Sequence, residues 1–126
     1  MLNYLVSIII GSLVFSNALA AEKFVCKTST HIATINPLSA GQYKYTAWNK
    51  PKSMTDKPDM VIMKGKQIIE GTGVCHYTRW EFNNSNTKYV VSTPVTCTES
   101  IPPSNAIGEL SIFINDEFRK SSWCLK

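Results

Sequence analysis

Charged side chains are absent from the first 20 residues of the chain. Tyr4 to Phe15 forms an apolar stretch of about a dozen residues, which suits a secretory signal and is too short to span a bilayer comfortably. Ala18-Leu19-Ala20 then supplies the small-x-small pattern that a signal peptidase requires, and no cysteine follows it to carry a lipid anchor. We therefore expect residues 1–20 to be a cleaved signal peptide and residues 21–126 to be one soluble domain, exported to the periplasm or secreted.

The sequence also lacks the residue patterns that catalysis or metal binding needs. Its two histidines, His31 and His76, stand far apart, without the H-x-x-x-H or C-x-x-C spacing that holds zinc. A G-x-S-x-G elbow and a phosphate-binding glycine loop are both missing. Cys75 and His76 are adjacent, but neighbours in a strand point to opposite faces and cannot act as nucleophile and base. We expect a protein that is not an enzyme and that has no metal or cofactor.

Four cysteines lie in the expected exported part of the chain. An even number in an exported chain of this size indicates two disulfides, and three pairings are possible. We favour Cys26–Cys124 with Cys75–Cys97, because this pattern ties the two terminal strands together and closes one local loop.

The hydrophobic pattern has a period of two, and no segment shows helical amphipathicity. The 106 residues that follow the signal suffice for one domain and are too few for two. The predicted strands are residues 24–32, 43–48, 59–64, 66–70, 74–82, 87–95, 108–114 and 117–125. They predict an all-β fold, a small antiparallel meander that is closed as a barrel or folded as a sandwich.

Turn residues separate these strands. Asn36-Pro37 should end the first, and Gly65 should turn the chain between the third and the fourth. Asn83–Asn86 and Asn115-Asp116 should close two hairpins, because Asn and Asp tolerate the left-handed backbone region. Residues 49–58 hold two prolines and should form an irregular loop.

Lysine is concentrated in the first half of the exported part. Residues 21–66 carry eight lysines against three acidic residues, and Lys50, Lys52 and Lys57 all fall in the 49–58 loop. These three are our candidate binding loop for an acidic partner. The alternative is that they keep a small domain soluble and protect its strand edges.

Tyr77, Arg79 and Glu81 share one face of a predicted strand, opposite Trp80 and Phe82. Such a polar stripe indicates either a ligand-facing surface or the solvated face of a half-buried strand. Aromatic side chains that stay exposed beside the lysine-rich loop would suit a protein interface. We therefore name Trp48, Tyr77, Arg79 and Glu81 as a candidate binding surface.

The blocks at residues 43–51, 57–59, 70–75 and 80–82 resemble small exported bacterial proteins. In general plan, with a signal peptide, a small antiparallel barrel and bridged cysteines, the chain is similar to periplasmic lysozyme inhibitors. Those inhibitors carry a Ser-Gly-x-x-Tyr motif, whereas this chain has Ser39-Ala40-Gly41-Gln42-Tyr43. The resemblance is therefore one of architecture, and it implies a fold but neither lysozyme inhibition nor any functional residue.

These observations favour a non-catalytic binding protein of the periplasm or the exterior, such as an inhibitor or immunity protein. The expected partner is another protein, an envelope or secreted enzyme, and not nucleic acid, from which export separates the chain. An envelope structural protein or a barrel that carries a small ligand is the alternative, and a secreted hydrolase or toxin that uses His76 is a third. The loops at residues 49–58 and 98–107 are the first places to look, since binding residues concentrate on loops.

Overall fold

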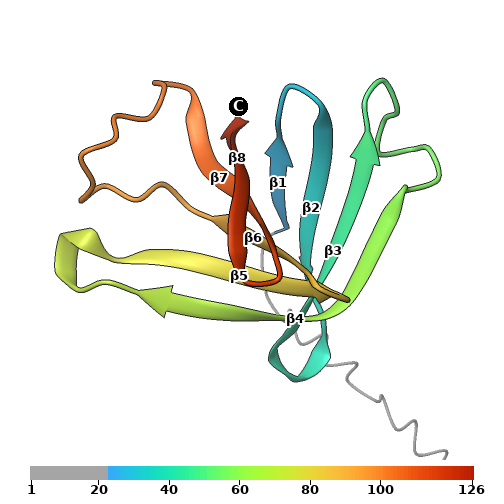
Figure 1. Cartoon of the computed structure of the whole chain (residues 1–126), viewed down its shortest axis with the longest axis horizontal. Helices are drawn as coiled ribbons and strands as arrows, with labels where there is room; N and C mark the ends of the chain where they lie inside the picture. The colour runs from blue at the N-terminus through green and yellow to red at the C-terminus, as the bar shows by residue number, and fades with distance from the viewer. Residues whose placement is uncertain (1–22) are drawn as a thin grey trace, which may run out of the picture.

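A computed structural model describes residues 23–126, so the signal peptide expected over residues 1–20 lies outside the described residues. The strands are β1 (Phe24–Lys27), β2 (His31–Pro37), β3 (Gln42–Asn49), β4 (Met60–Glu70), β5 (Tyr77–Asn84), β6 (Thr87–Ser92), β7 (Ala106–Ile114) and β8 (Glu117–Leu125). Each pairs antiparallel with the next, and β1 pairs with β8 to close a barrel (Figure 1). The all-β meander is confirmed, and of the two forms left open it is the barrel.

Two short 3-10 turns, η1 (Ser39–Gly41) and η2 (Gly73–Cys75), interrupt the connections between strands. Within residues 23–126, no helix is long and apolar enough to cross a membrane.

Both favoured disulfides are present. Cys26–Cys124 joins β1 to β8 and is fully buried, while Cys75–Cys97 joins η2 to the loop between β6 and β7. Two disulfides fit an oxidising compartment. One of them closes the barrel, and the other braces a segment that leaves it.

Aromatic rings fill much of the barrel interior. The ring centroid of Tyr45 lies 5.2 Å from that of Phe82 and 5.3 Å from that of Tyr89. The other buried members of the core are mainly small or aliphatic: Cys26, Ala33, Ile35, Ala47, Ile62, Trp80, Val91, Leu110 and Cys124. An eight-stranded barrel of this kind is just wide enough for side chains to pack its interior.

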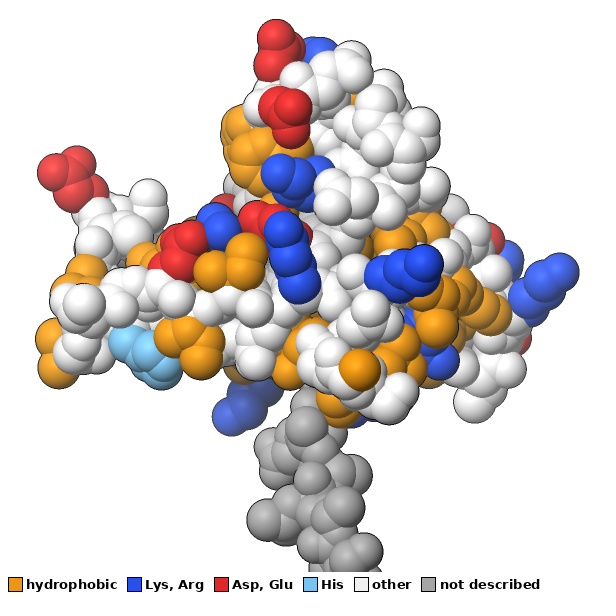
Figure 2. Space-filling view, turned by 90° about the horizontal axis from the view of Figure 1, so that it is seen from below, with side chains coloured by type: hydrophobic (Ala, Val, Ile, Leu, Met, Phe, Trp, Pro, Cys, Tyr) orange, Lys and Arg blue, Asp and Glu red, His pale blue; other side chains and the backbone are white. Residues whose placement is uncertain are grey.

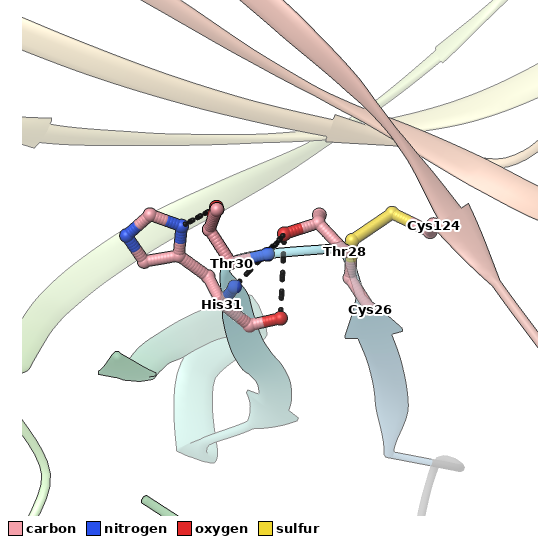
Figure 3. The surroundings of a disulfide bond; sticks show 5 residues. All are labelled: Cys26, Thr28, Thr30, His31 and Cys124. Atoms are coloured by element: carbon pink, nitrogen blue, oxygen red, sulfur yellow. Dashed lines mark hydrogen bonds between the residues drawn. A yellow bond between two sulfur atoms is a disulfide. The ribbon is translucent and has the colours of Figure 1, made fainter. Parts of the chain in front are cut away.

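The first predicted strand, residues 24–32, is wrong, because it is a hairpin made of β1 and β2. The Thr28 hydroxyl accepts hydrogen bonds from the backbone N–H groups of Thr30, at 3.3 Å, and His31, at 3.0 Å (Figure 3). The Thr28 N–H also donates to the His31 carbonyl at 2.9 Å, so the side chain reinforces the backbone bond of a turn that holds no glycine or asparagine. The Ser and Thr residues of this turn also suit strands, so the sequence pattern hides it.

The predicted turn at Gly65 is also wrong, because β4 runs through it without interruption. The pairing register between β3 and β4 shifts between Tyr43 and Tyr45, and Lys64 has a φ of 63°. These are the marks of a β-bulge, which bends a strand at a barrel corner. Gly65 is buried at the bend, where the ring of Phe82 covers it.

Beyond the bulge, β4 and β5 continue past the barrel as a two-stranded arm (Figure 1). We call residues 69–78, where β4 and β5 pair with each other alone, the arm, and residues 71–76 the arm tip. The strand predicted over 74–82 begins only at Tyr77, because η2 occupies the tip. The strand predicted over 87–95 ends at Ser92, and β7 begins at Ala106, two residues earlier than predicted.

Candidate functional site

The arm tip is fixed to the loop formed by residues 93–105. Cys75–Cys97 joins the two segments covalently, and the Thr96 hydroxyl donates a hydrogen bond to the Val74 carbonyl at 2.9 Å. Nearer the barrel, the Thr93 N–H donates to the Thr78 carbonyl at 2.9 Å. The second half of the tip and the start of β5 are therefore held against this loop, and the tip does not project as a free hairpin.

Large apolar side chains are exposed on these two braced segments. Ile69 is 60% exposed, Val74 89% and Ile101 92%. In Figure 2 the arm projects to the left of the barrel, and hydrophobic side chains gather at its end. The loop that contains Ile101 was predicted as a candidate, whereas Ile69 and Val74 were not, because their exposure depends on the arm leaving the barrel.

Tyr77, Arg79 and Glu81 share the outer face of β5, as predicted. Arg79 Nη2 lies 2.7 Å from Glu70 Oε1 and 3.2 Å from Glu81 Oε1. The Tyr77 hydroxyl donates to Glu70 Oε2 at 2.5 Å, and this hydrogen bond raises the pKa of Tyr77. The three predicted residues therefore form one network in which Glu70 is the member that the sequence analysis missed.

This network lines an open groove of about 400 Å³ on the outside of β5, β6 and β7. Val90 and Phe113 supply apolar wall, and Lys88 and Asp116 supply one charge of each sign. Because the guanidinium of Arg79 is already shared by two carboxylates, the groove carries balanced charge. Such a surface suits polar contacts to a partner better than the capture of an anion.

The expected place of Trp48 in this surface is wrong. Its side chain is only 6% exposed, and its indole N–H donates to the Asp56 carbonyl at 2.9 Å. Trp48 faces away from the barrel core, and the lysine-rich loop covers it. The ring anchors that loop and is not available to a partner.

Lys50, Lys52 and Lys57 are all exposed on the loop between β3 and β4. Lys52 Nζ lies 2.6 Å from Asp59 Oδ1, while in the described part of the chain Lys50 and Lys57 form no ion pair. The Asn49 N–H donates to Asp59 Oδ2 at 2.7 Å, and this bond together with Lys52 lowers the pKa of Asp59. The loop is thus ordered and basic, and its role in binding stays a prediction.

A cavity of about 200 Å³ opens at the end of the barrel where β2 begins and β3 ends, and we call it the mouth. Its lining comes from five strands and the loop before β4: His31, Tyr45, Ala47, Asn49, Asp59, Met60, Tyr89, Leu110 and Ile112. Burial of the phenol and the nearby Tyr89 raise the pKa of Tyr45, which is 2% exposed. The sequence analysis missed this cavity, because residues from so many strands meet only once the barrel closes.

Among residues 23–126, no group of three or more His, Cys, Asp or Glu side chains is placed to hold a metal ion. Comparison with protein-family models, with curated proteins and with solved structures gave no match to the chain.

Proposed function

We propose that this chain is a non-catalytic binding protein of the periplasm or the exterior that holds another protein, as an inhibitor or an immunity protein does. The observation that carries the proposal is the arm tip. A disulfide and a hydrogen bond fix the tip to the 93–105 loop, yet Val74 and Ile101 on these segments stay almost fully exposed. Exposed apolar side chains on a braced projection are typical of a surface that a partner covers.

Holding the tip rigid favours a binding role, because less conformational entropy is then lost when a partner binds. An interface that must order its side chains and loops loses about 0.5–1.5 kcal/mol for each immobilised flexible side chain. The crosslink between Cys75 and Cys97 restricts the tip before a partner arrives, so less freedom is lost on binding. Ile69, Val74 and Ile101 would supply the apolar centre of the interface, and the polar groove along β5 would supply its rim.

The lysine-rich loop adds an electrostatic element to the proposal. Lys50 and Lys57 are exposed cations, and an acidic partner would be steered toward them at low salt. Such charges at the edge of an interface act on the association rate more than on the lifetime of the complex.

The test is to immobilise the oxidised protein and to identify the proteins that it retains from envelope extracts and from a panel of cell-wall hydrolases. The same capture is then repeated with the variants Val74→Asp and Ile101→Asp. We expect one stoichiometric partner whose affinity falls at least tenfold in either variant, because a charge would then enter an apolar contact. Val61→Asp is the matched control, since Val61 on β4 is also 51% exposed and lines neither the groove nor the mouth. A partner retained equally by all variants would remove the arm tip from the function.

Charge reversal distinguishes the contribution of the lysine-rich loop to binding from that of the arm tip. Lys50→Glu, Lys52→Glu and Lys57→Glu together should slow association and abolish its salt dependence if the loop faces the partner. Reversal of the exposed Lys23, Lys120 and Lys126 gives the same change in net charge elsewhere. Equal rates for the two triple variants would return the loop lysines to the role of solubilising groups.

A ligand carrier of the envelope has one observation in its favour, which is the cavity at the mouth. At about 200 Å³ it falls below the roughly 300–1,000 Å³ of pockets that take drug-sized ligands. Aromatic rings fill the rest of the interior, so a long acyl chain does not fit. Mass spectrometry of co-purified small molecules would test this second function.

A further inference from the structure

The mouth combines an apolar interior with a polar rim. Ala47, Met60, Leu110 and Ile112 line its depth, while His31, Asn49 and Asp59 lie where β2, β3 and β4 reach the end of the barrel. A mostly apolar cavity with a few convergent polar groups is the usual form of a small-ligand site, and barrel mouths are a common place for one.

The volume sets the size of the ligand. A dry apolar cavity of about 150 Å³ is known to bind benzene. The mouth offers about 200 Å³, which leaves room for a six-membered ring and one or two further atoms. Tyr45 and Tyr89 stack on each other on one side of the mouth, 5.3 Å apart between centroids. We call this pair the tyrosine wall, and a ligand ring can pack edge-to-face or offset against it.

The hydroxyl of Tyr45 indicates which polar atom the ligand carries. Tyr45 is 2% exposed and lines the cavity, and within residues 23–126 its hydroxyl makes no hydrogen bond to another protein group. Among residues 23–126 the fully buried side-chain atoms without a partner are Arg79 Nε and Trp80 Nε1, so the Tyr45 hydroxyl is instead open to the cavity. A ligand atom that reaches this hydroxyl can form a hydrogen bond with it, and a typical bond of this kind contributes about 0.5–1.5 kcal/mol. Burial raises the pKa of Tyr45, so the group is a neutral hydroxyl that can both donate and accept.

The rim offers a negatively charged ligand no unpaired cation at Asp59 and Lys52. Asp59 is held as a carboxylate by the Asn49 N–H and by Lys52, and hydrogen bonding to these groups lowers its pKa. The His31 Nδ1 is hydrogen bonded to the Thr30 hydroxyl at 2.7 Å, which fixes the ring at the rim. An acidic substituent on the ring would find the Lys52 ammonium already paired with Asp59, whereas a neutral hydroxyl needs no counter-charge.

We propose that the mouth of the barrel binds one phenol-type ring, a six-membered apolar ring with a single neutral hydroxyl that pairs with Tyr45. The ring packs between the tyrosine wall and the side chains of Leu110 and Ile112. This proposal does not rest on the protein-binding function, because it concerns the opposite end of β4 from the arm tip.

The first experiment titrates p-cresol into the oxidised protein and follows the methyl resonances of Met60, Leu110 and Ile112 by NMR. We expect saturable shifts confined to the mouth, weaker binding of toluene, which lacks the hydroxyl, and weaker binding of p-toluate, which carries a charge. Absence of shifts up to the solubility limit of p-cresol would overturn the proposal. Equal binding of toluene would overturn the part assigned to Tyr45.

Variants make the test specific. Tyr45→Phe keeps the ring and removes the hydroxyl, and should weaken p-cresol about five- to tenfold, the effect of one lost hydrogen bond, while leaving toluene unchanged. Tyr43→Phe is the matched control, because the Tyr43 hydroxyl donates to Gln67 outside the mouth. Ala47→Val fills part of the cavity and should abolish binding of both rings; if it does not, the ligand sits elsewhere.

The ring can come from a free phenol or from a tyrosine side chain of a bound protein. Adding p-cresol in excess to the capture experiment separates the sources. Release of the partner by p-cresol assigns the mouth to a partner tyrosine, and retention of the partner together with p-cresol binding assigns it to a free ligand. The NMR titration needs no partner, so failure of the capture experiment leaves it intact.

Discussion

The ring of Phe82 on β5 lies directly against the α-carbon of Gly65 on β4. A methyl group built at Gly65 would stand 2.1 Å from Cε1 of that ring, far inside van der Waals contact. Gly65 has no left-handed backbone angle, so the glycine is required by the ring and not by the turn chemistry of its backbone. The contact fixes the corner at which β4 leaves the barrel.

Gly65→Ala should therefore lower the free energy of unfolding by about 1–3 kcal/mol, the usual effect of overpacking. Urea unfolding measures it. A second substitution, Phe82→Leu, should recover part of the loss in a double-mutant cycle. Gly73→Ala serves as comparison, since it meets no atom within 4 Å and its φ of 58° alone should make it unfavourable. Additive effects of the Gly65 and Phe82 changes would contradict the contact.

The two disulfides should contribute unequally to stability. Cys26 and Cys124 are 98 residues apart in sequence, and Cys75 and Cys97 are 22 apart. In the chain-entropy account, these loops correspond to about 5 and about 3 kcal/mol respectively. Paired Cys→Ala variants compared by urea unfolding test the order, and a larger loss at the shorter loop would refute it.

Loss of Cys75–Cys97 should also have a local effect. Amide hydrogen exchange should accelerate over the arm tip and the 93–105 loop and stay unchanged in β2 and β3. A uniform increase across the barrel would show that the crosslink stabilises the whole fold and not the projection.

Asp59 should stabilise the fold only where it is ionised. Hydrogen bonds from Asn49 and Lys52 lower its pKa in the folded state below the unfolded value of about 3.9. Its contribution is therefore present above that pH and is lost as pH falls through the folded value. Asp59→Asn should destabilise the protein at neutral pH and match the wild type in strong acid. A difference that persists in acid would locate the effect in packing.

Tyr45 should make the free energy of unfolding depend on pH in the opposite direction, at high pH. Its folded pKa is raised by burial above the unfolded value of about 10. The stability it confers is thus present below about pH 10 and declines as pH rises from there through the folded value. Tyr45→Phe should make urea midpoints fall less steeply in alkali, although Tyr77 and Tyr89, whose pKa values are also raised, keep part of the slope. An unaltered slope would mean that Tyr45 is solvated.

Sequence reasoning located the turns whose chemistry is local. Asn115 and Asp116 both adopt positive φ, 51° and 63°, and they join β7 to β8 where the pattern places the turn. Few residue types tolerate that region, so the signal is specific. The hairpin at Thr28 escaped prediction because its turn holds no glycine or asparagine, and Gly65 was misread because glycine serves both turns and close contacts.

The residues of the candidate site also fall into two groups: those whose placement follows from their spacing along a strand, and those that come together only when the chain folds. Tyr77, Arg79 and Glu81 share a face because side chains alternate along a strand, and this could be predicted from spacing alone. The position of Trp48 depends on a loop that folds back over it, which spacing does not reveal. The mouth needs the register of several strands at once, so His31 and Ile112 give no sign in the sequence that they meet.

The seam between β1 and β8 joins the two strands of the barrel that lie farthest apart in the sequence. Every other pairing joins strands that follow one another, so each of those hairpins can form as soon as its second strand has been made. The seam can form only after residue 124 has been synthesised, because Cys26 forms its disulfide with Cys124. β8 pairs with β1 only at Lys27 and Leu125, so the covalent bond between Cys26 and Cys124 is what holds the two strands together along the rest of the seam. An oxidant that acted before Cys124 was available would join Cys26 to Cys75 or Cys97, and the edge of β1 would stay open to pairing with another chain.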